Sequence, residues 1–370
     1  MFEADAYRDV RKPLLEASTL PPFCYTSEDF FRREIEHVFL PHWQFVGREE
    51  QLDAAGKYFC HEGVGGSVIV LRDADNGLRA YANSCRHRGA RLMSGSGACK
   101  RIVCPYHSWA YRLDGSLANA PGMQAVEGFE TGQFPLVELE LQTWAGFVFV
   151  RYRAGGEDLA EHLGSMTSKF DGHGCERMQL VGDLEFEVDS NWKLLAENAL
   201  EAYHTGSVHR ETLGQQQARA VDTSGSWTGL LVEDENSVAT LPGEDKPFPH
   251  IDGLDDEARS GAYFTLLYPS TQFVFAQDCM WWLNFEPLAV DRTRVTIGAC
   301  FPRSTIELPG FEEKVKPYFD RWRRATAEDN AICEAQQQGQ RLERPPGRFA
   351  ASEFAVHALA NWLLDQVLDQ

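Results

Sequence analysis

Two short clusters of cysteine and histidine offer the clearest chemistry in this sequence. The first is Cys85-Arg-His87 and the second is Cys104-Pro-Tyr-His107, so each cluster supplies one thiolate and one imidazole. Two thiolates and two imidazoles are the ligands of a Rieske [2Fe–2S] centre, in which two histidines replace two cysteines on one of the irons. The pattern therefore predicts that the two cysteines hold one iron and the two histidines hold the other.

A zinc site is an alternative interpretation of the same residues, because zinc also binds thiolates and imidazoles. Zinc fingers, however, place two cysteines in one knuckle and two histidines in the other, whereas each knuckle here contains one of each. Buried cysteines without a ligand role would leave the matched histidines unexplained. Trp109 lies just past the second cluster, where it could shield the cluster from water or pack in an ordinary core.

A second group of candidate ligands lies further along the chain. We predict a helix over residues 191–203, which are mostly good helix formers, and expect it to loosen after Thr205-Gly206. His204 and His209 lie five residues apart, near one face of this helix. Glu201 precedes His204 by three residues and should share that face.

Two imidazoles and one carboxylate can hold non-haem Fe(II) and leave coordination positions open for O₂ and substrate. The carboxylate should come from another element, and we take Asp329 as the best candidate and Glu328 as the second choice. Two histidines at this spacing are more often polar groups on a helix surface, and an acidic side chain on a helix is usually solvated. From spacing alone, both interpretations of His204 and His209 stay open.

The composition narrows the possible partners. The chain has 370 residues, which suggests about two domains. Its formal charge is −20 and its isoelectric point is near 5.0, so we expect neither nucleic acid nor an anionic membrane as partner. No apolar stretch is long enough to span a bilayer, and the first residues do not resemble a secretory signal. We expect a cytoplasmic protein whose cysteines outside the two clusters are free thiols.

Short β runs separated by turn residues occupy residues 42–152, for example Ser67–Leu71 and Leu78–Tyr81. We predict an all-β domain there, with both cysteine–histidine clusters in its loops. Residues 153–370 should form a second, catalytic domain of mixed helices and strands, and the segment 1–41 should pack with it. The elements expected in the second domain are strands at 179–188, 273–285 and 294–301, helices at 311–340 and 353–368, and a long surface loop or lid at 232–251.

Together these motifs resemble those of the α subunits, or terminal oxygenases, of Rieske non-haem iron oxygenases. The resemblance covers nearly the whole chain and is carried by Cys85-Arg-His87-Arg-Gly89, Cys104-Pro-Tyr-His107, Ser190-Asn-Trp-Lys193, Glu197-Asn198, Tyr203-His204, His209 and Asp329. It implies an α+β fold that combines an all-β Rieske [2Fe–2S] domain with a helix-grip catalytic domain. It also implies one [2Fe–2S] cluster and one Fe²⁺ per chain, and a homotrimer in which electrons cross from one protomer to the next.

One position departs from the family pattern. Members usually carry aspartate where this chain has Glu201, and that aspartate bridges a cluster histidine and an iron-ligand histidine across the subunit interface. The resemblance therefore implies that Glu201 is an inter-subunit electron bridge, and it places Asn198 near the iron ligands as a supporting residue. Glutamate at this position resembles the branch of the family that acts on quaternary ammonium compounds, such as carnitine oxygenase.

Aromatic residues agree with such a substrate, because aromatic faces hold trimethylammonium groups by cation–π attraction. The candidate pocket residues are Tyr203, Phe264, Tyr268, Trp281 and Trp282, although aromatic residues in strands usually belong to the core. The activity we expect is O₂-dependent hydroxylation of a carnitine- or betaine-type compound, followed by C–N cleavage or N-demethylation. The alternative is an aromatic ring-hydroxylating dioxygenase, or an aromatic O- or N-demethylase.

No GxGxxG motif stands between a strand and a helix, so we place neither nicotinamide nor flavin on this chain. Electrons from NAD(P)H are expected through a separate reductase that carries flavin and iron–sulfur groups. Whether a β subunit is present stays open. A Rieske electron-transfer protein that has lost its mononuclear iron is a more remote alternative, against which His204, His209 and Asp329 argue.

Overall fold

The computed structural model describes residues 1–234, 237–244 and 248–368. These residues form helices and antiparallel sheets, which confirms the predicted α+β class. None of the helices within them is both long and apolar enough to cross a membrane. The chain folds as two compact units, described separately below: Phe39–Gly156, and Met1–Val38 together with Glu157–Gln370.

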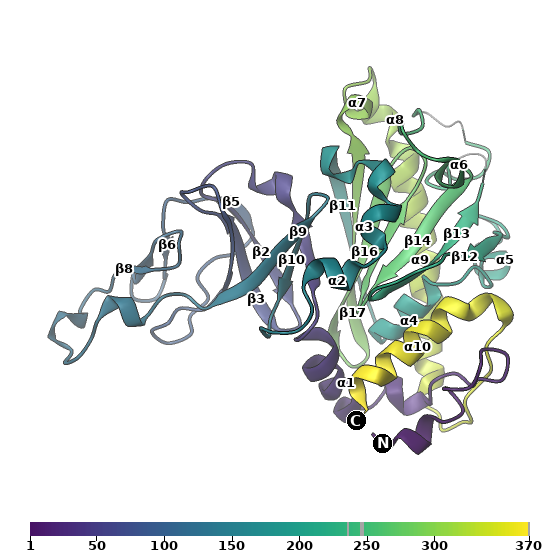
Figure 1. Ribbon diagram of the computed structural model, residues 1–370, viewed down its shortest axis with the longest axis horizontal. Helices are drawn as coiled ribbons and strands as arrows, with labels where there is room; N and C mark the ends of the chain where they lie inside the picture. Colours follow the sequence, from purple (N-terminus) through teal and green to yellow (C-terminus); the bar gives the residue numbers. More distant parts are fainter. Residues whose placement is uncertain (235–236, 245–247, 369–370) are drawn as a thin grey trace. The chain divides into compact units, whose positions relative to one another are not determined.

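Two antiparallel sheets make up the unit Phe39–Gly156 (Figure 1). The larger sheet contains, in spatial order, β1 (Gln44–Arg48), β10 (Phe147–Arg151), β9 (Glu138–Trp144), β4 (Leu78–Ala82), β3 (Gly66–Arg72), β2 (Lys57–Gly63) and β5 (Ser96–Ala98). The smaller sheet contains β6 (Ile102–Val103), β7 (Ala110–Tyr111) and β8 (Leu117–Asn119). Short 3₁₀ helices occupy Glu49–Leu52, Met123–Ala125 and Thr131–Gln133.

Strand β3 shows how the sequence of this unit builds two cores. Side chains alternate between the two faces of a strand, so Val68 and Val70 pack in one hydrophobic cluster with β10, while Ile69 and Leu71 pack in another. The second cluster also contains both cysteines of the predicted [2Fe–2S] site. The two β runs predicted at Ser67–Leu71 and Leu78–Tyr81 pair as the antiparallel strands β3 and β4. The turn between them places Asn76 at a φ of 72°, which asparagine tolerates better than most residues.

The other unit is built on one seven-stranded sheet in which all neighbours are antiparallel. Its spatial order is β11 (Met178–Val188), β17 (Arg292–Pro302), β16 (Met280–Ala289), β15 (Thr271–Phe275), β14 (Gly261–Leu267), β13 (Trp227–Glu233) and β12 (Ala218–Ala220).

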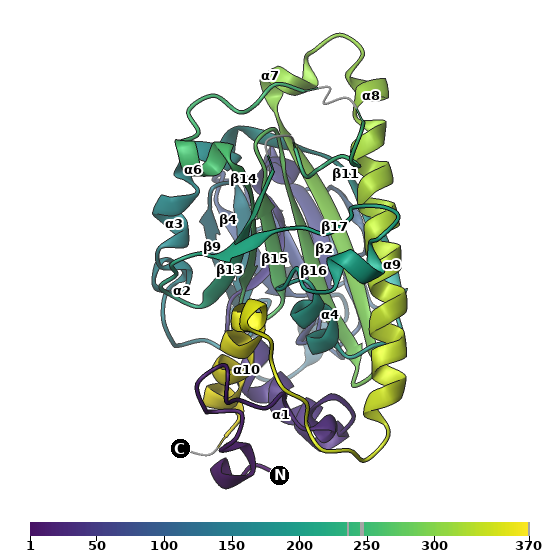
Figure 2. The same cartoon turned by 90° about the vertical axis from the view of Figure 1, so that its right-hand side faces the viewer.

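Helices surround this sheet, and α9 (Lys316–Gln340) packs along one of its faces (Figure 2). Tyr318 and Trp322 of α9 join the hydrophobic cluster that contains Trp281 and Ile297 of the sheet. The remaining α-helices are α1 (Glu28–Glu34), α2 (Leu159–Leu163), α3 (Met166–Lys169), α4 (Trp192–Asn198), α5 (Thr205–Val208), α6 (Asp256–Arg259), α7 (Arg303–Ile306), α8 (Phe311–Lys314) and α10 (Phe354–Val367). A π-helical turn covers Ile35–Phe39, and 3₁₀ turns cover Ala4–Tyr7, Pro22–Tyr25, Asp171–His173, Cys175–Arg177 and Ala351–Glu353.

Buried polar contacts tie the N-terminal segment to α4. The Lys193 ammonium lies 2.6 Å from a Glu34 carboxylate oxygen, and both side chains are buried. The Trp192 indole donates to the other oxygen of Glu34 at 3.3 Å, while the Tyr25 hydroxyl donates to Glu197 at 2.7 Å. Breaking one partner of a buried ion pair leaves an uncompensated charge, so these contacts hold α4 firmly in front of the sheet.

Three predicted elements differ from the structure in extent. The predicted strand at 273–285 is a hairpin, because β15 ends at Phe275 and β16 begins at Met280. The predicted helix at 191–203 ends five residues early, at Asn198, and His204 caps the separate short helix α5. The strands predicted at 179–188 and 294–301 and the helix at 353–368 are confirmed to within a few residues. The helix predicted at 311–340 is two helices, α8 and α9, which are separated at Val315.

The predicted surface loop at 232–251 is wrong in part. Strand β13 extends to Glu233, and Val238, Ala239 and Phe248 are buried in the core of the sheet. Residues 235–236 and 245–247 lie outside the described residues. The other described residues of this stretch form neither helix nor strand, and residues 234, 242–244 and 249 are exposed, as predicted for a surface loop.

Gly298 should be essential for packing on the face of the sheet opposite the α9 cluster. A Cβ added there would lie 1.9 Å from the Trp282 ring. We expect Gly298→Ala to lower the free energy of unfolding by about 1–3 kcal/mol or more, since overpacking forces the neighbours apart. The measurement is urea denaturation. The control is Gly339→Ala in α9, where a Cβ meets nothing within 4 Å and stability should rise by up to about 1 kcal/mol. Equal midpoints for both variants would contradict the packing argument.

Candidate functional site

Two loops of the Phe39–Gly156 unit repeat the same backbone pattern around Cys85 and Cys104. In each loop the cysteine N–H donates to the carbonyl five residues later, and the cysteine carbonyl accepts from the N–H four residues later, with distances of 2.8–3.1 Å. The fifth residue of each loop has a positive φ, 73° at Gly89 and 58° at Ser108. A serine in this conformation is uncommon, so the structure repeats the loop geometry even where the residue does not favour it.

The side chains of these loops form a buried donor set. Cys85 and Cys104 are buried, and the rings of His87 and His107 lie with centroids 4.8 Å apart. The Nδ1 atoms of both histidines are buried and have no hydrogen-bond partner within the described chain. Buried polar atoms normally have a partner, so two thiols beside two unsatisfied imidazole nitrogens fit a bound [2Fe–2S] cluster. Trp109 stacks on His87 at 4.9 Å and is itself buried, so it both shields this site and belongs to the core.

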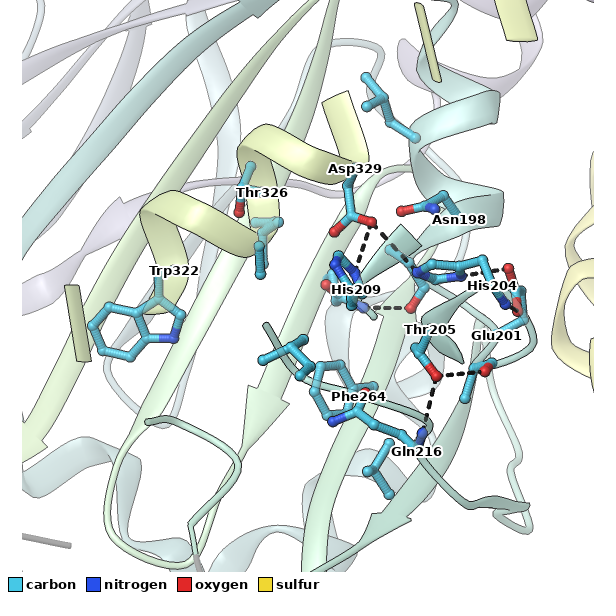
Figure 3. Close-up of a pocket in the computed structure, with 18 of the residues that line it drawn as sticks. Asn198, Glu201, His204, Thr205, His209, Gln216, Phe264, Trp322, Thr326 and Asp329 are labelled. Atoms are coloured by element: carbon cyan, nitrogen blue, oxygen red, sulfur yellow. Dashed lines mark hydrogen bonds and ion pairs between the residues drawn. The ribbon is translucent and has the colours of Figure 1, made fainter. Parts of the chain in front are cut away.

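In the other unit, the structure brings together the three residues predicted to bind iron. His204, His209 and Asp329 each offer a ligand atom, and these atoms lie within 4.8 Å of one another. Asp329 Oδ1 is 3.4 Å from His204 Nε2 and 3.0 Å from His209 Nε2 (Figure 3). Despite these distances, Oδ1 is buried and makes no hydrogen bond of good geometry within the described residues. The three atoms thus surround a common point, as ligands of one metal ion do.

The opposite nitrogen of each imidazole is held by a second carboxylate. His204 Nδ1 lies 2.6 Å from Glu201 Oε1, and His209 Nδ1 lies 2.7 Å from Glu328 Oε2. A carboxylate that accepts the Nδ1–H of a histidine leaves the Nε2 lone pair free for a metal. Glu328, our second choice as ligand, is therefore engaged on the far side of His209, where the Thr212 hydroxyl also donates to it at 2.7 Å.

Glu201 contacts His204 as predicted, but from a turn and not from the same face of a helix. The chain is not helical at Glu201, and its Oε2 accepts the backbone N–H groups of Tyr203 and His204. The carboxylate therefore caps the turn before α5 and binds the imidazole at the same time. A single side chain orders both the backbone and the ring of His204.

The charges in this site favour a bound cation. Burial alone would lower the pKa of His204, but its contacts with Asp329 and Glu201 raise it to about 9. Contacts with Asp329 and Glu328 likewise raise the pKa of His209 against the effect of burial. The two imidazoles in turn hold the pKa of Asp329 below its ordinary value, although burial opposes this. A divalent metal ion supplies positive charge at the same place and displaces the protons.

A pocket of about 750 Å³, including its open mouth, adjoins these residues. Asn198 lines it, as do Phe264 of β14 and Trp281 of β16, so three of the residues predicted near the iron or the substrate lie at the site. Trp281, Leu283 and Phe285 follow one another at every second position of β16. This spacing puts them on the same face of the sheet.

Three predicted pocket residues lie elsewhere. Trp282 projects from the other face of β16, over Gly298. Tyr203 is 67% exposed and Tyr268 is buried against Trp362, with ring centroids 4.5 Å apart; neither lines the pocket. The predictions for Tyr203, Tyr268 and Trp282 are therefore wrong, since aromatic character alone does not tell which face of an element a residue occupies.

Residues of α9 that we did not predict complete the pocket. Arg321, Trp322, Ala325 and Thr326 line it together with Asp329. These positions recur at the spacing of one helix face. Since a helix at 311–340 and Asp329 as a ligand were both predicted, counting back along that face from Asp329 would have found them.

Comparison with known proteins identifies the two units. A family model described as "Ring hydroxylating alpha subunit (catalytic domain)" matches residues 175–369, which is more than half of the chain. A second model, "Rieske [2Fe-2S] domain", matches residues 42–130. The chain belongs to the family of Rieske non-haem iron oxygenase α subunits. Its cofactors are accordingly a [2Fe–2S] cluster in the Rieske domain and a mononuclear iron in the catalytic domain.

Several relatives of this oxygenase α subunit are named for quaternary ammonium substrates. The carnitine monooxygenase oxygenase subunit of Escherichia coli K12 is 34% identical over 248 residues, which cover 63% of this chain and 64% of the relative. The chain thus spans a little under two thirds of that relative's length. The chloroplastic choline monooxygenase of Spinacia oleracea is 28% identical over 367 residues, covering 96% of this chain and 80% of the relative.

Solved structures of this family share the fold. A quaternary ammonium Rieske monooxygenase, whose structure is described as giving insights into carnitine oxidation and inter-subunit electron transfer, aligns with a TM-score of 0.80 at 26% identity and covers 95% of both chains. Naphthalene 1,2-dioxygenase from Rhodococcus sp. aligns with a TM-score of 0.79 at 18% identity, covering 95% of this chain and 94% of that one.

The two neighbouring acids of α9 should have different roles. Asp329→Ala should lose the mononuclear iron and keep the cluster, whereas Glu328→Gln should keep the iron with about 10–100-fold weaker affinity, the usual effect of changing a residue that orients a ligand. Metal analysis and the visible absorption of the cluster measure both effects. Asp320→Asn, in the same helix but in an exposed ion pair with Arg324, is the control. If Glu328→Gln abolished iron binding while Asp329→Ala retained it, the ligand would be Glu328.

Proposed function

We propose that this chain is the oxygenase component of a two-component Rieske monooxygenase that hydroxylates a quaternary ammonium compound of the carnitine or betaine type, leading to C–N cleavage or N-demethylation. The observation that carries the proposal is negative charge at one end of an aromatic-lined pocket. Glu201 and Asp329 line that end, and Glu328 lies just behind it. Three carboxylates exceed the charge of one ferrous ion, so a trimethylammonium group would be attracted there.

The aromatic walls support the same substrate class. The rings of Phe264 and Trp281 meet edge to face with centroids 5.9 Å apart. The ring centroids of Trp322 and Trp281 are 5.4 Å apart. Phe264 and the face of Trp281 that Arg321 does not cover can attract methylated ammonium groups without a directional hydrogen bond. The names of the relatives from Escherichia coli and Spinacia oleracea point to the same chemistry.

We assign the cofactor ligands as follows: Cys85, His87, Cys104 and His107 to the [2Fe–2S] cluster, and His204, His209 and Asp329 to the iron. When bound, the iron supplies O₂ activation with electrons that the cluster delivers. The protein residues have the other tasks. Glu201 and Glu328 retain the Nδ1 protons and fix both imidazoles, and the apolar walls exclude water from the bound C–H group.

We extend the proposal to partners and location. Electrons come from NAD(P)H through a separate flavin and iron–sulfur reductase, and the chain assembles as a homotrimer in the cytoplasm. None of the nine cysteines forms a disulfide, which agrees with a reducing compartment. We assign residues 42–152 to the cluster domain and residues 153–370, with 1–41 packed against them, to the iron domain. The two compact units of the structure support this division.

Substrate oxidation can be tested without the reductase. We expect chemically reduced protein, given O₂ and L-carnitine in a single turnover, to release trimethylamine, because hydroxylation next to nitrogen yields a product that breaks at the C–N bond. Mass spectrometry of the product is the measurement, and Asp329→Ala with an intact cluster is the control that should yield none. Product from naphthalene but from no quaternary ammonium compound would contradict the proposed substrate class.

Glu201 provides a separate test of electron delivery. We propose that it also accepts a hydrogen bond from a cluster histidine of a neighbouring subunit, in addition to the one from His204. Glu201→Gln should then slow reoxidation of the reduced cluster in a single turnover, and Glu201→Asp should slow it less, since it keeps the charge but shortens the reach. Cluster absorption over time measures the rate, and metal content should stay unchanged. Wild-type rates in both variants would refute the bridging role.

A further inference from the structure

An arginine that forms no ion pair with any described residue lies in the wall of the substrate pocket. Arg321 is 6% exposed and lines the pocket. Its Nε is buried without a hydrogen-bond partner, and no carboxylate of residues 1–234, 237–244 or 248–368 lies within ion-pair distance. Buried charges are normally paired because desolvation is costly. The Arg321 guanidinium is therefore suited to bind an anion that the chain itself does not supply.

Its surroundings compensate this charge only in part. The guanidinium carbon lies 5.4 Å from the centroid of the Trp281 ring, an attractive but weak contact. Burial lowers the pKa of Arg321 to about 10, against the opposing charge of Asp329, so the group remains positive at neutral pH. The ring face that Arg321 occupies is no longer available to a substrate ammonium group.

A second unsatisfied donor follows directly in the sequence. The indole Nε1 of Trp322 is buried and also has no hydrogen-bond partner in the described chain. Figure 3 places Trp322 on the opposite side of the pocket residues from His204. Two adjacent residues of α9 thus bring donors to the pocket, and no acceptor of the described chain meets them. An oxygen-bearing anion is the complement of this arrangement.

We propose that Arg321 binds a carboxylate of the substrate, assisted by Trp322, and that the substrate is a zwitterion. The identity of its cationic end rests on the proposed function, whereas the carboxylate is inferred from Arg321 itself. Arg321 and Asp329 lie eight residues apart on α9, which separates their Cα atoms by about 12 Å along the helix. The pocket is thus positive at one end and negative at the other, matching a molecule that carries both charges.

This polarity selects among quaternary ammonium compounds. A compound with only an ammonium group leaves Arg321 desolvated and unpaired, and brings a second positive charge into the same pocket. A compound with an ammonium and a carboxylate satisfies both ends. Its methylated nitrogen is then directed toward His204, His209 and Asp329, where the C–H bond is to be oxidised.

Three probes of matched shape separate the two charges. γ-Butyrobetaine carries both, 5,5-dimethylhexanoate keeps the carboxylate with a neutral tert-butyl group, and butyltrimethylammonium keeps the ammonium with a methyl in place of the carboxylate. Each is titrated calorimetrically into oxidised holoenzyme without O₂. The variants are Arg321→Met, which keeps length without charge, and Arg323→Met, an exposed control in the same helix.

We expect Arg321→Met to weaken the two carboxylate probes by about 30-fold or more, as expected for leaving a desolvated charge without its partner. Butyltrimethylammonium should bind wild type more weakly than γ-butyrobetaine, and should bind Arg321→Met at least as well as wild type. Arg323→Met should change none of these values. Equal binding of all probes to wild type and Arg321→Met, or no binding of either carboxylate to wild type, overturns the proposal.

The same set of titrations distinguishes a failure of this inference from a failure of the proposed function. If 5,5-dimethylhexanoate binds as tightly as γ-butyrobetaine and depends on Arg321, the carboxylate site stands and the quaternary ammonium function fails. If butyltrimethylammonium binds as tightly as γ-butyrobetaine regardless of Arg321, the function stands and the inference fails.

Stability adds a second readout: substrate-free Arg321→Met should melt no lower than wild type, since no internal ion pair is lost, and a strong drop would indicate a structural role instead.

Discussion

The proposed iron site depends on two hydrogen bonds to the imidazoles of its histidine ligands, on the side away from the metal. Glu201 and Glu328 accept the Nδ1 protons of His204 and His209, and this leaves both Nε2 atoms turned toward Asp329. Without these carboxylates each ring could rotate or exchange its proton between nitrogens, and the metal would lose fixed ligands. The surrounding structure serves this constraint: the turn before α5 supplies Glu201, and α9 supplies the other two acids.

Helix α9 carries residues of both the proposed metal site and the proposed substrate site. One face of this helix carries Asp329 at the iron end and Arg321 further along, so the same rigid element positions both. Its packing on the sheet through Tyr318 and Trp322 keeps that spacing constant. Strand β16 contributes the facing aromatic wall through Trp281, while Trp282 packs behind it against Gly298. The alternation of a strand and the period of a helix thus create one pocket between them.

Much of this organisation could be predicted from the sequence. Cysteine–histidine pairs at short spacing have few uses other than metal binding, so the cluster ligands could be predicted. The long helix around Asp329 is clear from its residue pattern, and this helped to identify Asp329 as a candidate iron ligand. The end of α4 at Asn198 could not be predicted, because residues 199–203 favour a helix, whereas Glu201 accepts the backbone N–H groups of Tyr203 and His204 in a turn. The prediction that Tyr203, Tyr268 and Trp282 line the pocket was wrong, because the orientation of these side chains depends on tertiary packing. Arg321 was overlooked because an arginine in a helix usually reaches solvent.

An anomalous-difference map at the iron absorption edge, from crystals of the holoenzyme, would show which atoms hold the iron. We expect a single peak in the catalytic domain, within bonding distance of Nε2 of His204, Nε2 of His209 and the Asp329 carboxylate, with Glu201 and Glu328 still hydrogen-bonded to the Nδ1 atoms. A peak bound through either Nδ1 atom, or one held by Glu328 in place of Asp329, would contradict this expectation.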